Sequence, residues 1–282
     1  MSEKERADHR QKFSCLVSLL REAESAVLAF SGGVDSSFLL KAMSISGMNV
    51  LAVTAASATV PGEETIYATC VAKEAGVEQI IIETEELSNE SFVSNPPDRC
   101  FFCKDELFRR LKLIAEERNC RFVFDGSNSD DLSDYRPGRR AASLHGVRSP
   151  LAECGFSKKE IREMSRELGM GGWDRPSSPC LSSRFPYGRR ITREALRRIE
   201  KSEKFLRTLG FREVRVRDHG DTARIEVAEG ELHLFFIPEN RKLAAETLKS
   251  FGYHFISLDL EGFRPGSMNR VLEDKHFQST PR

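Results

Sequence analysis

The sequence of 282 residues lacks three features that would each point to a broad class of protein. No apolar run approaches the ~20 residues that a membrane-spanning helix needs, and the amino-terminal stretch MSEKERADHRQK is too charged for a signal peptide. Net charge is also absent, because 43 basic residues balance 43 acidic residues, and this balance argues against a large nucleic-acid footprint. We therefore expect a soluble, cytoplasmic protein.

The sequence also has few closely spaced cysteines. The seven cysteines are an odd number and include one close pair, Cys100 and Cys103, which argues against a secreted disulfide framework. A second CxxC that would complete a four-cysteine zinc site is missing as well. The cysteines therefore point to metal or thiol chemistry.

Two common phosphate-binding motifs, GxxxxGK[ST] and GxGxxG, are also missing. The chain instead carries SGGVDSS at residues 31–37, directly after the apolar run 26–30. Gly32 and Gly33 allow a tight turn whose N–H groups face one concavity, and the helix that follows adds its positive dipole end. This lysine-free motif resembles the PP-loop of ATP pyrophosphatases, which split ATP between its α and β phosphates. The alternative is a plain Gly/Ser turn in which Asp35 only starts a helix.

Strand and helix signals alternate through the first half of the chain. Apolar, strand-like runs lie at 26–30, 50–54, 79–83 and 121–125, and helical patterns lie at 35–45, 63–75 and 100–118. This alternation predicts an α/β fold with a doubly wound parallel sheet, and the PP-loop resemblance implies the adenine nucleotide alpha hydrolase-like version of it. Ligands of such sheets bind beyond the carboxyl ends of the strands.

We expect a nucleotide at that edge of the sheet. The predicted nucleotide-binding residues are Ser31, Gly32, Gly33, Asp35, Ser36, Ser37, Thr54, Gly126 and Asn128. Asp130 and Asp131 follow in a polar loop, where they either hold Mg²⁺ or cap a turn.

The length of the chain predicts one larger and one smaller domain. Residues 169–188 are rich in Gly, Pro and Ser, so we place the boundary there, with a PP-loop domain at 1–185 and a smaller α/β domain at 186–282. Before this hinge, Ser157 and Glu160 form a capping box that opens a helix. After the hinge we expect helices at 192–209 and 241–250 and strands at 213–217, 223–227 and 254–258.

Three cysteines lie in chemically suggestive surroundings. Cys100 and Cys103 stand at a predicted helix start, which favours thiolates, and their pair is typical of a redox couple, half of a zinc site or part of an iron–sulfur site. Cys180 lies in the polar loop RPSSPCLSSRFPYG. Together the three could hold a [4Fe–4S] cluster with one iron open. We interpret the other four as small buried residues, as lone cysteines commonly are: Cys15, Cys70, Cys120 and Cys154.

A basic segment surrounds and follows Cys180. Residues 175–224 contain 14 Lys and Arg against 6 Asp and Glu, which suits an anionic ligand or a solvated helix face. Arg215 and Arg217 alternate on a predicted strand and so point to the same side, either to bind a phosphate or to form an exposed face. Glu203 falls on the apolar stripe of a helix and needs a partner there, as an ion pair with an arginine or as a site residue.

Seven segments together resemble one enzyme family. SGGVDSS, PPDRCFFCK, DGSNSDDLSDYRPGRRA, SPL with KKEIREMSRELG, PCLSSRFPYGRRIT, VRVRDHGDTARIEV and LDLEGFRPGSMN are similar to the LarE family of ATP-dependent sulfur transferases. These enzymes serve the synthesis of the nickel-pincer cofactor of lactate racemase and similar enzymes.

The resemblance implies that ATP with Mg²⁺ adenylates the carboxylates of pyridinium-3,5-biscarboxylic acid mononucleotide and that sulfur then replaces AMP. It implies catalytic roles for Asp35, Cys180 and Glu203. The implied ligands of the substrate's phosphate are Ser183, Arg184, Arg215 and Arg217. The implied cluster ligands are Cys100, Cys103 and Cys180, although some members of the family sacrifice the sulfur of the cysteine at the position of Cys180 instead.

A small-molecule nucleotide substrate, a homo-oligomer and a hand-off to other nickel-pincer biosynthesis enzymes are the expected partners, with no nucleic acid or membrane. Two other functions stay open: a PP-loop enzyme of tRNA thiolation, and a nucleotide-binding iron–sulfur redox sensor without turnover.

Overall fold

The computed structural model describes residues 3–132, 137–176, 178–264 and 266. The chain divides into two compact units. Unit 1 comprises Met1–Phe92 and Asp98–Ser178, and unit 2 comprises Val93–Pro97 and Pro179–Arg282. Parts of the segments 125–141 and 258–269 that carry the family resemblance lie outside the described residues.

Unit 1 is built on a parallel sheet whose strands lie in the order β3-β2-β1-β4. The strands are β1 (Ser25–Ala29), β2 (Asn49–Ala56), β3 (Glu78–Glu83) and β4 (Phe122–Phe124). Its longer helices are α1 (Glu3–Ala23), α2 (Val34–Ser46), α3 (Gly62–Glu74), α5 (Arg99–Glu117), α6 (Gly138–Leu144) and α8 (Lys158–Glu167). The alternating strand and helix pattern of the sequence is thereby confirmed.

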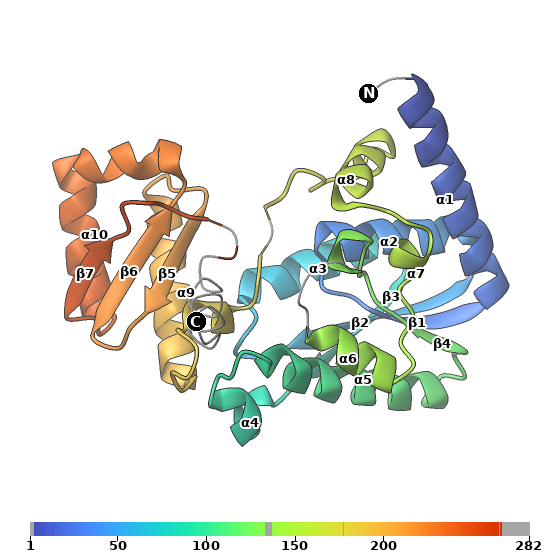
Figure 1. Cartoon of the computed structure of the whole chain (residues 1–282), viewed down its shortest axis with the longest axis horizontal. Helices are drawn as coiled ribbons and strands as arrows, with labels where there is room; N and C mark the ends of the chain where they lie inside the picture. The colour runs from blue at the N-terminus through green and yellow to red at the C-terminus, as the bar shows by residue number, and fades with distance from the viewer. Residues whose placement is uncertain (1–2, 133–136, 177, 265, 267–282) are drawn as a thin grey trace, which may run out of the picture. The chain divides into compact units, whose positions relative to one another are not determined.

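Helices cover both faces of this sheet, as Figure 1 shows. Alternate residues of β1 divide between the two faces: Ala26 and Leu28 pack with α1, α2, α3 and α8, whereas Val27 packs with α5 and α6. Two separate apolar cores result, one on each side. The doubly wound α/β fold predicted from the sequence is confirmed, and the loop after β1 opens at the carboxyl end of the sheet.

Unit 2 has a three-stranded sheet in the order β5-β6-β7. Strand β5 (Val214–Asp218) pairs antiparallel with β6 (Thr222–Val227), which pairs parallel with β7 (Phe255–Leu258). One apolar cluster joins this sheet to α9 (Arg193–Thr208) and α10 (Pro238–Ser250). The expected small α/β unit is therefore present.

The short helices complete the description of the elements. They are η1 (Glu86–Ser88), α4 (Glu90–Val93), η2 (Asp130–Leu132), α7 (Pro150–Glu153), η3 (Leu181–Arg184) and η4 (Glu229–Phe236), where η marks a 3₁₀ helix. Within the ranges that the structure describes, every helix is too short or too polar to cross a lipid bilayer.

The boundary between the units differs from the one expected at residue 185. It falls after Ser178, and the distant segment Val93–Pro97 belongs to unit 2. The segment Val93–Pro97 joins unit 2 through backbone hydrogen bonds: Gly188 N donates to Asn95 O at 2.9 Å and Ile191 N donates to Val93 O at 2.8 Å. Such pairing between distant segments leaves no compositional trace in the sequence.

Candidate functional site

The loop between β1 and α2 has the shape of an anion-binding turn. Gly32 adopts the left-handed region with φ of 72°, and a Cβ there would lie 2.9 Å from Ala68 Cα, so both conformation and space require glycine. Gly33 precedes α2 as its N-cap and supplies no side-chain hydrogen bond. Because no side chain caps them, the first N–H groups of α2 are available to an anion.

The serines of this loop hold its shape. Ser36 Oγ donates to Gly33 O at 3.1 Å and Ser37 Oγ donates to Gly32 O at 3.2 Å. Ser31 Oγ lies 3.1 Å from Ser36 Oγ. Gly126, two residues after β4, approaches so closely that a Cβ would lie 3.0 Å from Ser36 N. The residues expected to gather around the loop are therefore brought together, and Gly126 is there for close backbone contact.

Asp35, in the first turn of α2, carries the charge of this loop. Its Oδ2 accepts from Lys158 Nζ at 2.5 Å and from Asn128 Nδ2 at 3.4 Å, whereas Oδ1 is buried with no hydrogen-bond partner among the described residues. Burial raises the pKa of the Asp35 carboxyl above its usual value, and the charge of Lys158 offsets part of that rise. A divalent cation bound at Oδ1 would satisfy the orphaned oxygen, so the donor set fits Mg²⁺.

Lys158 was missed in the sequence, where it looked like one of several surface lysines at a helix start. The predicted capping box is confirmed: Ser157 and Glu160 exchange hydrogen bonds at the start of α8, and this fixes Lys158 at the first position of the helix. Asp130 accepts from Lys158 N at 2.8 Å, and Asp131 accepts from Asn128 N at 3.1 Å. These bonds favour the capping alternative for both aspartates.

Thr54 lies at the carboxyl end of β2 and is buried. Its hydroxyl donates to Phe30 O at 2.8 Å and accepts from Gln79 Nε2 at 2.8 Å. One bond ties β2 to Phe30, directly after β1, and the other ties β2 to Gln79, the second residue of β3. A direct role for Thr54 in nucleotide binding stays a prediction.

The pair Cys100 and Cys103 lies at the start of α5, as expected. Cys100 is exposed, and the Cys103 thiol donates to Glu86 Oε1 at 3.7 Å. Glu86 is buried and also accepts from Thr84 Oγ1 at 2.9 Å. Among the described residues, no group of three His, Cys, Asp or Glu side chains is placed to hold a metal. The pair offers two sulfur ligands, so the cluster stays a prediction.

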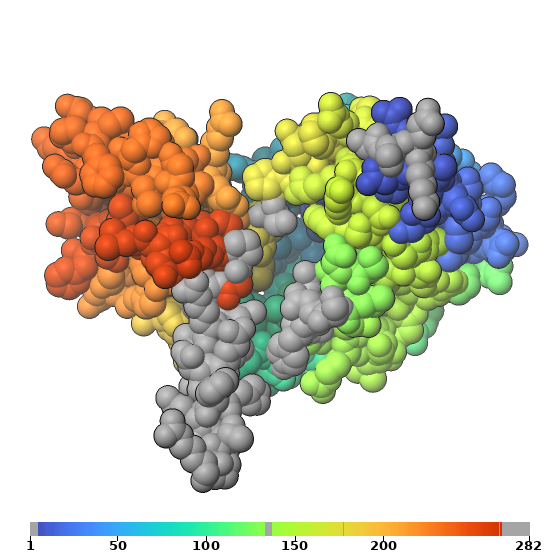
Figure 2. Space-filling view, turned by 45° about the horizontal axis from the view of Figure 1, so that its top comes forward, coloured from blue at the N-terminus to red at the C-terminus, as the bar shows by residue number. Residues whose placement is uncertain are grey.

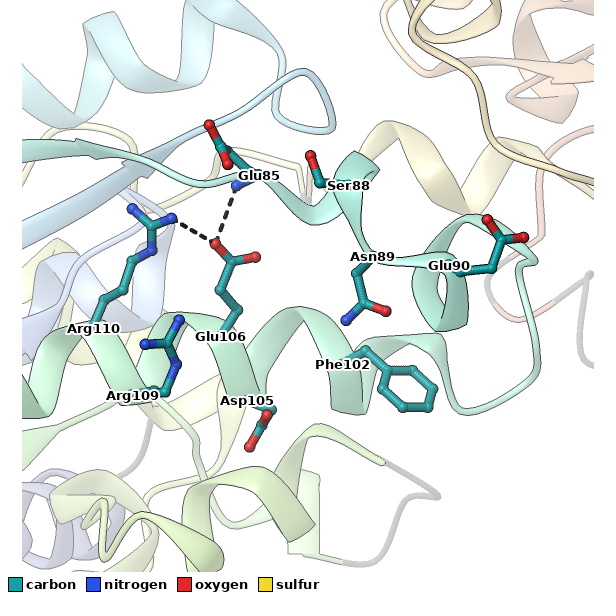
Figure 3. Close-up of a pocket in the computed structure, with 9 residues that line it drawn as sticks. All are labelled: Glu85, Ser88, Asn89, Glu90, Phe102, Asp105, Glu106, Arg109 and Arg110. Atoms are coloured by element: carbon teal, nitrogen blue, oxygen red, sulfur yellow. Dashed lines mark hydrogen bonds and ion pairs between the residues drawn. The ribbon is translucent and has the colours of Figure 1, made fainter.

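An open groove of about 540 Å³ lies along α5 (Figure 3). Its walls carry charges of both signs, and Glu106 pairs with Arg110 at 2.9 Å. The lining residues are Glu85, Ser88, Asn89, Glu90, Phe102, Asp105, Glu106, Arg109 and Arg110. None of the predicted site residues is among them, although Phe102 stands next to Cys103 in the chain.

In unit 2, Cys180 precedes the turn η3 and is half-buried. The guanidinium of Arg184 braces this turn, because its Nη1 donates to Pro179 O at 2.8 Å, to Cys180 O at 3.2 Å and to Ser183 Oγ at 2.9 Å. Arg184 therefore fixes the backbone on which the Cys180 thiol is mounted.

Glu203 is the partner of Arg184. Its two carboxylate oxygens accept from Arg184 Nε at 2.8 Å and Nη2 at 3.0 Å, and Oε1 also accepts from Val216 N at 3.0 Å. Both side chains of the pair are almost fully buried. Such a bidentate buried pair favours the ion-pair interpretation of Glu203; a catalytic role for it stays a prediction.

Arg215 and Arg217 lie on β5 and are buried, so the alternative of an exposed strand face is wrong. Arg217 donates to Ser183 O at 2.8 Å and to Glu226 Oε2. Burial and the positive charge of Arg184 lower the pKa of Arg215 to about 10. Guanidinium groups crowded in this way near Ser183 favour a negatively charged ligand.

The fold and the loop geometry define a class of protein. A parallel sheet in this strand order, with an uncapped, lysine-free SGGVDSS turn at its carboxyl edge, is the architecture of PP-loop enzymes. One distant relative of this class is a probable tRNA sulfurtransferase of Methanothermobacter thermautotrophicus, 28% identical over 51% of this chain and 40% of that protein.

Two relatives match nearly the whole chain. A pyridinium-3,5-bisthiocarboxylic acid mononucleotide synthase of Lactiplantibacillus plantarum is 39% identical over 93% of this chain and 95% of that protein. An uncharacterized protein of Synechocystis sp. is 42% identical over 93% of this chain and 98% of that protein. No family model matches the chain. The chain belongs to the LarE-type pyridinium-3,5-bisthiocarboxylic acid mononucleotide synthase family.

Proposed function

We propose that this chain is an ATP-dependent sulfur transferase that converts the carboxylates of pyridinium-3,5-biscarboxylic acid mononucleotide to thiocarboxylates. The observation that carries the proposal is the match to the Lactiplantibacillus plantarum synthase over 95% of that protein. The alternative of a tRNA thiolase has less support, since the tRNA sulfurtransferase relative is matched over 40% of its length.

The first half-reaction uses unit 1. A substrate carboxylate oxygen attacks the α phosphorus of ATP, the bond to the β phosphate breaks, and pyrophosphate leaves while an acyl adenylate forms. The uncapped N–H groups of α2 suit the phosphates. Asp35 suits Mg²⁺, which screens the charge that develops on the leaving pyrophosphate. Lys158, at 2.5 Å from Asp35 Oδ2, holds the carboxylate in place.

The second half-reaction uses unit 2. A sulfur nucleophile attacks the activated acyl carbon, and AMP leaves with the electron pair of the broken bond. Arg215, Arg217 and Ser183 are proposed to hold the phosphate of the mononucleotide. Arg184, whose donors already bind Glu203 and the loop around Cys180, is proposed to position the Cys180 thiol.

The sulfur source is the finer part of the proposal. Cys100, Cys103 and Cys180 are proposed to ligate a [4Fe–4S] cluster, which when bound supplies an open iron that can carry an extra sulfide. The exposed Cys100 and the Cys103 thiol beside Glu86 suit thiolate ligation, because a bound metal ion displaces the thiol proton. Without a cluster, Cys180 itself would give up its sulfur and end as dehydroalanine.

The activity is tested by incubating the purified chain with ATP, Mg²⁺ and the biscarboxylic mononucleotide, with pyrophosphate and product mass measured together. We expect pyrophosphate release coupled to replacement of oxygen by sulfur in the product. Pyrophosphate release with tRNA but not with the mononucleotide would favour the thiolase. ATP binding with no turnover on either substrate would favour the redox sensor.

The sulfur source is tested by anaerobic reconstitution with iron and sulfide, comparing the wild-type chain with Cys100→Ala and with Cys70→Ala as the matched control. We expect the first variant to lose iron and multiple turnover and the second to keep both. Iron content equal in all three chains would reject the cluster, and dehydroalanine at position 180 after one turnover would support the sacrificial route. A homo-oligomer and a hand-off to other cofactor enzymes are further predictions.

A further inference from the structure

Two cysteines outside the proposed sites lie side by side. Cys15 is in the middle of α1 and Cys154 directly follows α7, and their Sγ atoms are 3.6 Å apart although 139 positions separate them in the chain. The expectation that the four lone cysteines would be buried is wrong, because Cys15 and Cys70 are exposed and Cys120 and Cys154 are half-buried. Nothing in the proposed reaction uses the thiol of Cys15 or Cys154.

Contacts that do not involve sulfur hold the two segments together. Lys12, one helical turn before Cys15, donates from its Nζ to Gly155 O at 3.0 Å and to Glu160 Oε1 at 2.6 Å. Gly155 directly follows Cys154 in the chain. Figure 2 shows α1, in blue, lying against the yellow-green segment that carries α7 and α8. The proximity of the thiols is therefore fixed by the surrounding structure.

The two thiols differ in reactivity. Burial and the neighbouring Cys15 thiol raise the pKa of Cys154 to about 12, although Arg148 offsets part of that rise. Cys154 accordingly stays protonated at neutral pH. Cys15 is the thiol that an oxidant in solution reaches first, because Cys15 is exposed whereas Cys154 is half-buried.

We propose that Cys15 and Cys154 form a site of reversible oxidation that closes to an intramolecular disulfide in the presence of hydrogen peroxide. Cys15 sulfur attacks one peroxide oxygen, the O–O bond breaks, and sulfenic acid and water form. Cys154 sulfur then attacks the sulfenic sulfur, the S–O bond breaks, and the Cys154 proton leaves with the hydroxide as a second water. The two thiols lose two electrons in total, which reduce one peroxide.

The geometry demands little movement. The sulfurs must close from 3.6 Å to about 2.05 Å. The other cysteines of unit 1 offer a matched comparison. Cys70 is also exposed and on a helix.

The test uses the full chain, reduced and then exposed to hydrogen peroxide without denaturant, followed by blocking of remaining thiols and tryptic mass mapping. The sequence places the two cysteines in separate tryptic peptides, FSCLVSLLR and SPLAECGFSK. We expect these two peptides to appear joined, and dithiothreitol to release them. The linked pair should also form in Cys70→Ser.

Two variants separate the proposal from general oxidation. Cys15→Ser should abolish the linked pair, and Cys154→Ser should leave Cys15 as sulfenic or sulfinic acid. Cys15 oxidised to sulfinic acid in the wild type, with no linked peptide, would overturn the proposal. A link that forms only in denaturant, or that joins Cys15 to Cys70, would overturn it as well.

Discussion

Asp35 in unit 1 and Glu203 in unit 2 are both carboxylates on helices, and each faces a cation, yet their surroundings differ. The side chain of Glu203 is 2% exposed and both oxygens are hydrogen bonded. The side chain of Asp35 is 20% exposed, and one oxygen has no hydrogen-bond partner among the described residues. Both oxygens of Glu203 are therefore occupied, whereas one oxygen of Asp35 can still accept a ligand. This difference favours a structural ion pair at Glu203 and supports the proposed cation site at Asp35.

The free-energy cost of burying a charge relates these surroundings to the different roles proposed for the two carboxylates. A buried charge is tolerated only when hydrogen-bond partners replace its water. A carboxylate whose two oxygens both have such partners, as in Glu203, has no oxygen left for a ligand. The rise in the pKa of Asp35 reflects the cost of incomplete replacement, which a bound cation would remove. Substitutions can test this difference between the two carboxylates.

The largest effect is expected for Glu203→Ala, which leaves the buried Arg184 without its bidentate partner. Removing one member of a buried pair costs about 3–5 kcal/mol. Urea unfolding followed by circular dichroism should show this loss. Replacing both residues, as in Arg184→Met with Glu203→Leu, should recover part of it. An unchanged midpoint with lost activity would instead make Glu203 catalytic.

Asp35→Asn should act on activity rather than on stability. Loss of the cation ligand should lower kcat by roughly 10²–10³-fold, as for other groups that stabilise developing charge. Because burial raises the folded-state pKa of Asp35, ionisation of this carboxyl destabilises the fold as pH rises through that pKa. The variant should therefore be at least as stable as the wild type at pH 7 in thermal unfolding. A less stable variant would contradict this interpretation.

Gly32→Ala tests the close approach in the nucleotide loop. Its Cβ would lie 2.9 Å from Ala68 Cα, whereas a Cβ on Gly47, which also has positive φ, would meet no described atom within 4 Å. Gly32→Ala and Gly47→Ala both place a side chain in the left-handed region of φ, which strains the backbone. Gly32→Ala adds overpacking that costs about 1–3 kcal/mol. Comparison of the two unfolding free energies isolates the clash; equal losses would show that conformation alone requires glycine.

Lys158→Met should shift the pH dependence of activity. Lys158 lowers the pKa of Asp35 against the effect of burial, so its removal should move the acid limb of the kcat profile to higher pH. Lys159→Met is the matched control, because Lys159 is exposed on the same helix and pairs with Glu163 at 3.8 Å. An acid limb that moves equally in both variants would reject a specific role for Lys158.

The smallest effect is expected for Ser157→Ala. It removes the hydrogen bond from Glu160 N at the start of α8, which should lower stability by about 1 kcal/mol. Thermal unfolding measures the loss, and Ser143→Ala on α6 serves as a comparison without a cap. A loss of activity larger than the loss of stability would indicate that the cap also positions Lys158.

Local signals in the sequence were sufficient for the elements of the fold. A continuous apolar run located β1 to within one residue, and the capping box located α8, because both signals come from residues that are neighbours in the sequence. The exposure of Cys15, the burial of Arg215 and Arg217 and the start of unit 2 at Pro179 were not foreseen. These properties depend on which distant segments pack together.

The sequence by itself determined the class of chemistry, since the glycines and serines of SGGVDSS suit a tight turn whose backbone N–H groups surround a phosphate. Tertiary structure decided the partners. It brought Lys158 to Asp35, Arg184 to Glu203 and Cys15 to Cys154. Each of these contacts joins residues far apart along the chain, where no period or motif links them, and only the packing of folded elements selects which charges and thiols meet.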